Sequence, residues 1–365
     1  MPSLKLLADD LTGALDTSAE LVGLFGPLSV VWSADVNPAP QDRCARVAID
    51  SGTRECQADE AFAAVQALAP RLAGAGIAYK KIDSLLRGPW VAELDACLRA
   101  ALWDACIVAP AFPHQGRLTR ASRQFARAPD GRWSPVGNSM VEQFSERGLD
   151  ARSADPDAAL QSGISVFDAE TEGDLDRVVQ AGRRYRGRLL WCGSGGLAGA
   201  LARGTEAGAS ARLKTPVLGV FGSDHPATAA QLAVCGDLVV RTADVGASLD
   251  RIRQALDDGV ALVQLQTPVA ASRAEAAQHF TQAIMRLSRS IEAPCTLLVA
   301  GGETLKAQCI AVGAGALLVS GRLEPGVPRS MIQGGAWTGV DVISKSGAFG
   351  PPDLWWKLLR QNGLI

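Results

Sequence analysis

The stretch LKLLADDLTGALDTSAELVGLF, residues 4–25, places five mostly apolar residues directly before two aspartates and a longer amphipathic segment. The run 4–8 is typical of a buried strand, and the residues after Asp9 and Asp10 have a helical pattern. The order of strand, polar turn and helix recurs after the apolar runs 45–50, 77–81, 164–169 and 188–193. This alternation predicts an α/β fold with a mainly parallel sheet.

A second series of strand-like runs begins after residues 204–214, GTEAGASARLK, which are mostly small and polar. We place a domain boundary there and expect one α/β domain of residues 1–210 and another of residues 211–365. The least regular segment is 116–157, for which we expect a long functional loop or an insertion. Its arginines, in GRLTRASRQFARAPDGRW, predict a mobile basic loop that attracts an anionic substrate.

Composition limits the class of protein. The chain has 365 residues, 47% hydrophobic and 20% charged, with a formal net charge of −2. These values are typical of a globular protein and argue against nucleic-acid binding. No apolar run is long enough to cross a bilayer, and the early aspartates argue against a signal peptide. The eight cysteines form no CxxC pair, which favours a cytoplasmic protein with reduced thiols, and three scattered histidines give little support for a zinc centre.

Charged residues follow two of the predicted strands. Asp9 and Asp10 come after the first, where they could hold substrate hydroxyls or accept a proton; the alternative is an N-cap for the next helix. The segment KKIDSLLRG, 80–88, follows another strand and suits an acidic small molecule, because Arg87 offers a planar fork and Lys81 a point charge. The alternative is a solvated loop with an internal Asp–Arg pair.

Three glycine-rich turns and one stiff turn are further candidates. The turns 193–196, 301–304 and 345–350 could bring backbone N–H groups close to a phosphate, although tight turns also need glycine for steric reasons. The stiff turn 110–117 either simply reverses the chain or presents Arg117 as a second anion contact. We expect His225 to be a capping or core residue rather than a catalytic one. No P-loop, GxSxG elbow or GxGxxG fingerprint is present.

Taken together and in this order, these motifs resemble those of the four-carbon acid sugar kinase family over nearly the whole chain. ADDLTGALD (8–16), KKIDSLLRG (80–88), the turn 110–117 and GSGGLA (193–198) are similar to its sugar-domain signatures. FGSDHPAT (221–228), AGGET (300–304), EPGVP (324–328) and KSGAFG (345–350) are similar to its nucleotide-domain signatures. Leu85 departs from the threonine usual in the family, and His225 departs from a small residue.

The resemblance implies transfer of the γ-phosphoryl group of ATP, with Mg²⁺, to a hydroxyl, expected to be the 4-hydroxyl, of threonate, erythronate or 3-oxo-tetronate. It implies a substrate site made of Asp9, Asp10, Lys81, Asp83, Ser84, Arg87, Arg117 and Ser194. It implies an ATP site made of Ser223, Gly301, Gly302, Glu303, Thr304, Lys345, Gly347 and Gly350. Asp83 and Asp10 remain alternatives for the base, and the metal ligands are left open.

We expect the reaction to take place in a cleft between the two domains, so that closure excludes water. A homodimer is also expected, with a small sugar acid and ATP as the other partners. The alternative function is a sugar-acid sensor on the same scaffold that has no catalytic activity. The identity of the four-carbon acid and its stereoisomer stays open.

Overall fold

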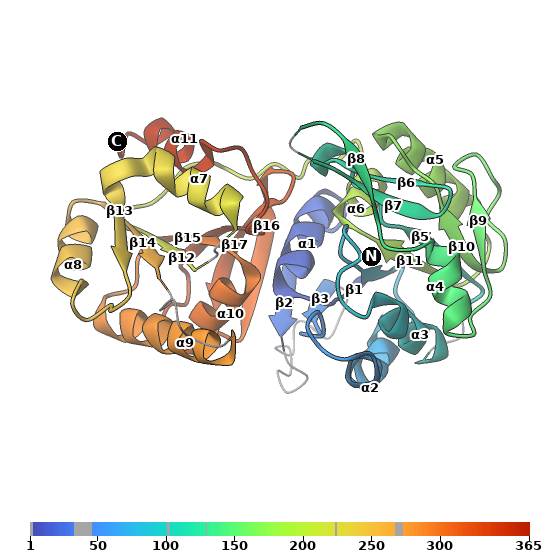
Figure 1. Cartoon of the computed structure of the whole chain (residues 1–365), viewed down its shortest axis with the longest axis horizontal. Coiled ribbons are helices and arrows are strands. Elements are labelled where there is room, and N and C mark those ends of the chain that lie inside the picture. Colours follow the sequence, from blue (N-terminus) through green and yellow to red (C-terminus); the bar gives the residue numbers. More distant parts are fainter. Residues whose placement is uncertain (1–2, 33–45, 101–102, 129, 223–224, 267–272) are drawn as a thin grey trace. The chain divides into compact units, whose positions relative to one another are not determined.

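The computed structural model describes residues 3–32, 46–100, 103–128, 130–222, 225–266 and 273–365. The contacts within the chain divide it into two units, Met1–Ala207 and Gly208–Ile365. Both are α/β units with mainly parallel strands, which confirms the predicted fold class (Figure 1). Within the described residues, no helix has the length and apolar character needed to cross a bilayer.

The first unit contains an eight-stranded parallel sheet in the order β2-β3-β1-β4-β11-β5-β10-β9. Its strands are β1 (Leu4–Ala8), β2 (Leu28–Trp32), β3 (Arg46–Asp50), β4 (Ile77–Lys81), β5 (Ala105–Ala109), β9 (Ala151–Ala154), β10 (Gly163–Phe167) and β11 (Leu189–Gly193). Its helices are α1 (Leu11–Phe25), α2 (Ala58–Leu68), η1 (Ala69–Leu72), α3 (Trp90–Ala100), η2 (Pro113–Gln115), α4 (Met140–Glu146), α5 (Glu172–Arg184) and α6 (Gly195–Leu201).

Two groups of helices flank this sheet. Helix α6 packs against both α1 and α5, whereas α2 packs against α3. The chain leaves β1 through α1 toward β2, and it leaves β4 through α3 in the opposite direction, toward β5. With right-handed crossovers, these connections place α1 and α3 on opposite faces. The gap between β1 and β4 is therefore the switch point, where ligands bind beyond the carboxyl ends of parallel strands.

Of the two alternatives for the segment 116–157, a long loop or an insertion, the structure contradicts the long irregular loop. The segment contains an antiparallel sheet of β6 (Arg117–Arg120), β7 (Arg123–Arg127) and β8 (Trp133–Val136), followed by α4 and β9. The strands of the small sheet lack an apolar pattern because they bury polar side chains that pair with each other. Thr119 donates to Gln124 across 2.7 Å, and both side chains are fully buried.

The second unit has the strand order β13-β14-β12-β15-β18-β17-β16. Strand β17 runs antiparallel to both β16 and β18, and the other pairs are parallel. Its strands are β12 (Val217–Phe221), β13 (Val239–Thr242), β14 (Val260–Leu265), β15 (Thr296–Ala300), β16 (Ala316–Glu324), β17 (Val327–Gln333) and β18 (Asp341–Lys345). Its helices are α7 (Pro226–Cys235), η3 (Gly236–Leu238), α8 (Leu249–Asp257), α9 (Arg273–Ser290), α10 (Gly302–Ala311) and α11 (Leu354–Gln361).

Figure 1 shows α7 and α11 on one face of the second unit's sheet and α9 and α10 on the other. The core under α7 and α11 is built on Phe221 and Trp355, whose rings lie 5.6 Å apart. The chain leaves β12 and β15 in opposite directions along the sheet. The switch point of this unit therefore lies between the strands that precede FGSDHPAT and AGGET.

Candidate functional site

Three aspartates meet one arginine at the switch point of the first unit. Asp9 and Asp10 follow β1, Asp83 follows β4, and Arg54 lies on the loop after β3. The Arg54 guanidinium donates to both oxygens of Asp9 and to Asp10 Oδ1 at 2.9 Å, and its Nη1 lies 3.6 Å from Asp83 Oδ1. Sequence reasoning missed Arg54, although its place just after a buried strand was the available signal.

The electrostatics of this cluster keep Asp9 and Asp83 ionised. Burial alone would raise the pKa of Asp9, but the charge and hydrogen bonds of Arg54, together with the charges of Lys80 and Lys81, more than offset it and hold that pKa below its ordinary value. Asp83 is likewise buried, and hydrogen bonds from Arg87, together with the charge of Arg54, depress its pKa. Asp16 differs, because burial raises its pKa to about 6.

Arg87 and Asp83 form a bidentate pair. Arg87 Nε lies 2.7 Å and Nη2 2.9 Å from the two Asp83 oxygens, while the arginine side chain remains 59% exposed. The internal Asp–Arg pair considered from the sequence is thus present. In this structure, Nε and Nη2 of Arg87 therefore bind the Asp83 carboxylate.

Two cations of the same cluster have no carboxylate partner within the described residues. Lys81 is buried, lies close enough to Asp9 and Asp83 to lower their pKa values, and forms no ion pair there. Within the described part of the chain, the Arg117 side chain donates only to the carbonyls of Gln115 and Gly116, and its buried Nε has no partner. These two side chains therefore have donors left for an anionic ligand.

Asp10 and Ser194 cap helices, as the alternative interpretation of Asp10 predicted. Asp10 accepts from the N–H of Gly13 at 2.8 Å at the start of α1. Ser194 accepts from Gly196 at the start of α6 and donates to the Ala111 carbonyl at 2.9 Å, so its hydroxyl is occupied. A ligand role for either residue stays a prediction.

Ser84 is held by the small antiparallel sheet. Its carbonyl accepts a 2.7 Å hydrogen bond from Gln124 Nε2, and its hydroxyl has no partner in the described part of the chain. The next residue but one, Leu86, has a left-handed φ of 55°, unusual for a leucine. The hydrogen bond from Gln124 on β7 therefore holds the substrate loop predicted from KKIDSLLRG in place.

The glycine turns of the second unit also meet. Gly301 caps α10 with a φ of 103°, which glycine adopts without strain, and its N–H donates to the Lys345 carbonyl at 2.9 Å. Gly302, the exposed Glu303 and the buried Thr304 follow as the first turn of α10. Ser223, also predicted to bind ATP, lies outside the described residues.

The loop 346–351 has its carbonyl groups turned toward buried side chains of α7 and β18. Gln231 Nε2 donates to the carbonyls of Phe349, Gly350 and Pro351 over 3.0–3.2 Å. Thr228 donates to the Gly347 carbonyl at 2.9 Å. Within the described residues, the N–H groups of 347, 348 and 350 donate to no partner. Such unpaired N–H groups can bind phosphate.

Lys345, the last residue of β18, directly precedes this loop. It is 1% exposed, its Nζ donates only to neutral oxygens, and burial lowers its pKa to about 7. His225, by contrast, caps α7 by accepting from the Ala227 N–H at 3.1 Å, as its capping interpretation predicted. Unpaired N–H groups beside a lysine are the kind of donors that can bind a phosphate.

We expect the Lys345→Met variant to be more stable than the wild type at pH 7, by on the order of 2 kcal/mol, because it removes a buried charge. The carbonyls of Ser346 and Gly347 keep other donors, Phe349 N–H and Thr228. The pKa of Lys345 is about 7 in the folded chain and 10.5 as its ordinary value. Burying the charged ammonium therefore destabilises the fold fully below pH 7, and this destabilisation disappears as the pH rises to 10.5. Urea unfolding at pH 7 and 10.5 measures the difference.

Lys357→Met is the matched control, since Lys357 is an exposed lysine of the same unit. Its stability relative to the wild type should not change between these two pH values. A Lys345→Met variant that is less stable than the wild type at pH 7 would show that the buried ammonium stabilises the fold.

Comparisons with known proteins find relatives that match nearly the whole chain. Residues 4–143 match a family model described as a sugar-binding N-terminal domain, and residues 218–354 match a nucleotide-binding C-terminal domain. The chain is 31% identical to a D-threonate kinase of Cupriavidus necator over 96% of each chain. It is 29% identical to a D-threonate kinase of Bordetella bronchiseptica, covering 97% of this chain and 96% of that protein.

Solved structures share the fold. A Haemophilus influenzae protein has a TM-score of 0.70 at 17% identity, covering 98% of this chain and all of that one. The two family models thus describe a protein with a sugar-binding N-terminal and a nucleotide-binding C-terminal domain. The chain belongs to the four-carbon acid sugar kinase family, and this confirms the predicted family and enzyme class, a phosphotransferase.

Proposed function

We propose that the chain transfers the γ-phosphoryl group of ATP to a hydroxyl, the 4-hydroxyl, of a four-carbon sugar acid such as threonate, erythronate or 3-oxo-tetronate. The observation that carries this proposal is identity of 31% to a D-threonate kinase along 96% of the chain. Other relatives are named D-erythronate kinase and 3-oxo-tetronate kinase, at 25% and 26% identity. The buried charged cluster of the first unit suits a small acid that carries hydroxyl groups.

In this proposal, residues 1–210 bind the sugar acid. Lys81 and Arg117 hold its carboxylate, because neither has a carboxylate partner in the described structure, and Arg87 adds a rim contact. Asp9 and Arg54 keep the cluster rigid. Asp10, Asp83 and the Ser84 hydroxyl orient the substrate hydroxyls, with Asp83 or Asp10 accepting the proton. A depressed pKa does not exclude Asp83, since phosphoryl transfer depends more on alignment than on base strength.

Residues 211–365 bind ATP in the same proposal. The first turn of α10 and the loop 346–351 supply N–H groups, and Lys345 supplies a charge to the phosphates. Within the described residues, there is no group of three or more acidic, histidine or cysteine side chains that could coordinate a metal ion. We therefore propose that Mg²⁺ binds mainly through phosphate oxygens and water, as is usual for this ion.

Transfer requires the γ-phosphate and the substrate hydroxyl to meet with water excluded. A cleft between the two domains, a homodimeric assembly and a cytoplasmic location remain predictions. The free thiols of the described residues, most of them buried, support the last of these.

A coupled assay of ADP release with ATP, Mg²⁺ and a panel of four-carbon acids tests this function. We expect turnover on at least one acid and a rise in melting temperature with ATP alone. If no acid is turned over and ATP leaves the melting temperature unchanged, the proposal is wrong. If an acid raises the melting temperature without ADP release, the sensor function is supported instead.

A further inference from the structure

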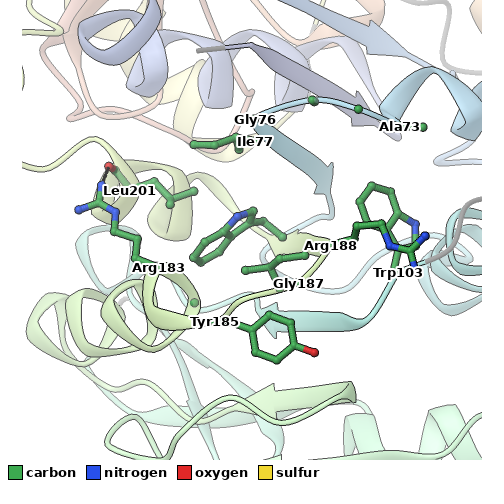
Figure 2. Close-up of a pocket in the computed structure, with 14 residues that line it drawn as sticks. Ala73, Gly76, Ile77, Trp103, Arg183, Tyr185, Gly187, Arg188 and Leu201 are labelled. Carbon is green, nitrogen blue, oxygen red and sulfur yellow. Dashed lines mark hydrogen bonds between the residues drawn. The ribbon is translucent and has the colours of Figure 1, made fainter. Parts of the chain in front are cut away.

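A cavity of about 520 Å³ lies at the amino edge of the first unit's sheet. Ile77 and Leu189, the first residues of β4 and β11, line it. The proposed sugar-acid residues of these strands lie at or beyond their last residues, Lys81 and Gly193, which are about 13 Å away at 3.3 Å per residue. Figure 2 shows Ile77, Tyr185, Arg188 and Leu201 arranged around the cavity. It is therefore a separate site from the one described above.

Apolar and aromatic side chains form part of the wall of this cavity. They include Trp191, Leu201, Ile77 and Trp103. The Trp191 ring lies under α5, because Gly182 has no side chain there: a Cβ atom at 182 would come within 2.2 Å of the ring. A volume of this size, with both apolar and polar groups in the wall, is within the usual range for a small-molecule site.

No lining residue of the cavity is acidic, and the charged side chains among them are Arg183 and Arg188. Arg188 is neutralised by Asp104, which accepts from its side chain at 2.9 Å and 3.2 Å. Arg183 differs, because it donates only to the Leu201 carbonyl, at 2.8 Å, and has no acidic partner within the described residues. The indole N–H of Trp191, a residue only 5% exposed, likewise has no partner there.

An occupant must therefore accept hydrogen bonds, carry negative charge and present a flat apolar body to the indole rings. A four-carbon polyol acid meets the first two requirements and not the third. We propose that this cavity is a second ligand site, which binds a small aromatic anion such as an aromatic carboxylate, with Arg183 pairing with its charge. This inference does not rest on the proposed kinase activity.

Calorimetric titration of the full chain with salicylate, and with phenol as the uncharged comparison, tests the site. We expect salicylate to bind at least about tenfold more tightly than phenol, because a charge-assisted hydrogen bond contributes this much. Arg183→Gln should weaken salicylate binding about tenfold, and Arg183→Lys should restore most of it. Arg184→Gln is the matched control, an exposed arginine of the same helix that does not line the cavity, and should bind as the wild type does.

Three results would overturn the proposal: no salicylate binding to the wild type, equal affinity for phenol, or equal losses in Arg183→Gln and Arg184→Gln. Saturating ATP and D-threonate should not displace salicylate, and displacement by D-threonate would mean that the probe had entered the sugar-acid site. The melting temperature of each variant shows that it is folded. Because these outcomes need no turnover, they stay separate from the outcome of the kinase assay.

Discussion

Replacing Arg54 with methionine is expected to lower the free energy of unfolding by about 3–5 kcal/mol at pH 7. Arg54 is the direct ion-pair partner of Asp9, and the Asp9 side chain is only 2% exposed. Without the guanidinium, a buried carboxylate would be left with more distant cations alone. Urea unfolding followed by circular dichroism measures the loss, and the affinity for the sugar acid should fall at least about 100-fold in parallel.

The pH dependence gives this prediction a second readout. The pKa of Asp9 is lowered in the folded wild type, so its pairing stabilises the fold above the ordinary value of 3.8 and this contribution is lost in acid. The stability difference between wild type and Arg54→Met should therefore shrink as the pH falls below 3.8.

The double variant Asp9→Asn/Arg54→Met should recover part of the stability, because it removes both buried charges. Arg87→Met serves as a control, since Arg87 is half exposed and its loss should cost much less. If Arg54→Met unfolds at the same urea concentration as the wild type, the ion-pair cluster does not organise this edge of the sheet.

The second large effect is expected for Asp83→Asn, which should lower kcat/KM for the sugar acid about 10³-fold. Asparagine keeps an acceptor for Arg87 and for the backbone N–H groups of Leu85 and Arg87, so the loop should keep its shape. It removes the negative charge that orients the substrate hydroxyl and accepts its proton. The rise in melting temperature with ATP should remain as in the wild type.

Asp104→Asn is the matched control for this variant. Asp104 forms a similar bidentate pair with Arg188, near the start of β5 and remote from the proposed reaction. Its kcat/KM should stay within about twofold of the wild type, as expected for an exposed ion pair. Equal activity of Asp83→Asn and Asp104→Asn would remove Asp83 from the proposed mechanism.

The sequence was informative where the physics is local. Short apolar runs before Asp9, Asp83 and Gly301 and up to Gly193 predicted strand ends. Asp9, Asp83 and Gly301 do follow β1, β4 and β15, and Gly193 is the last residue of β11. Helix capping is equally local: the Asp10 side chain accepts from an N–H group three residues later, at the start of α1. Among the strands that were missed is Leu28–Trp32, because only two residues separate it from α1 and its apolar run continues the helical pattern.

Pairing between distant segments was not predictable in the same way. Arg54 meets Asp9 only because β3 lies beside β1, and strand order is not written in any single stretch of sequence. The prediction of a basic loop at 116–133 was wrong for a related reason. Its strands are stabilised by buried polar pairs such as Thr119 with Gln124, which leave no apolar periodicity to detect.

Phosphorus NMR of the chain incubated with ATP, Mg²⁺ and D-threonate tests the proposed phosphoryl transfer most directly. We predict a new phosphomonoester signal that grows in step with ADP and is absent without the sugar acid. Inorganic phosphate appearing in place of the ester, or ATP unchanged with every four-carbon acid supplied, would contradict the assignment of this chain as a sugar-acid kinase.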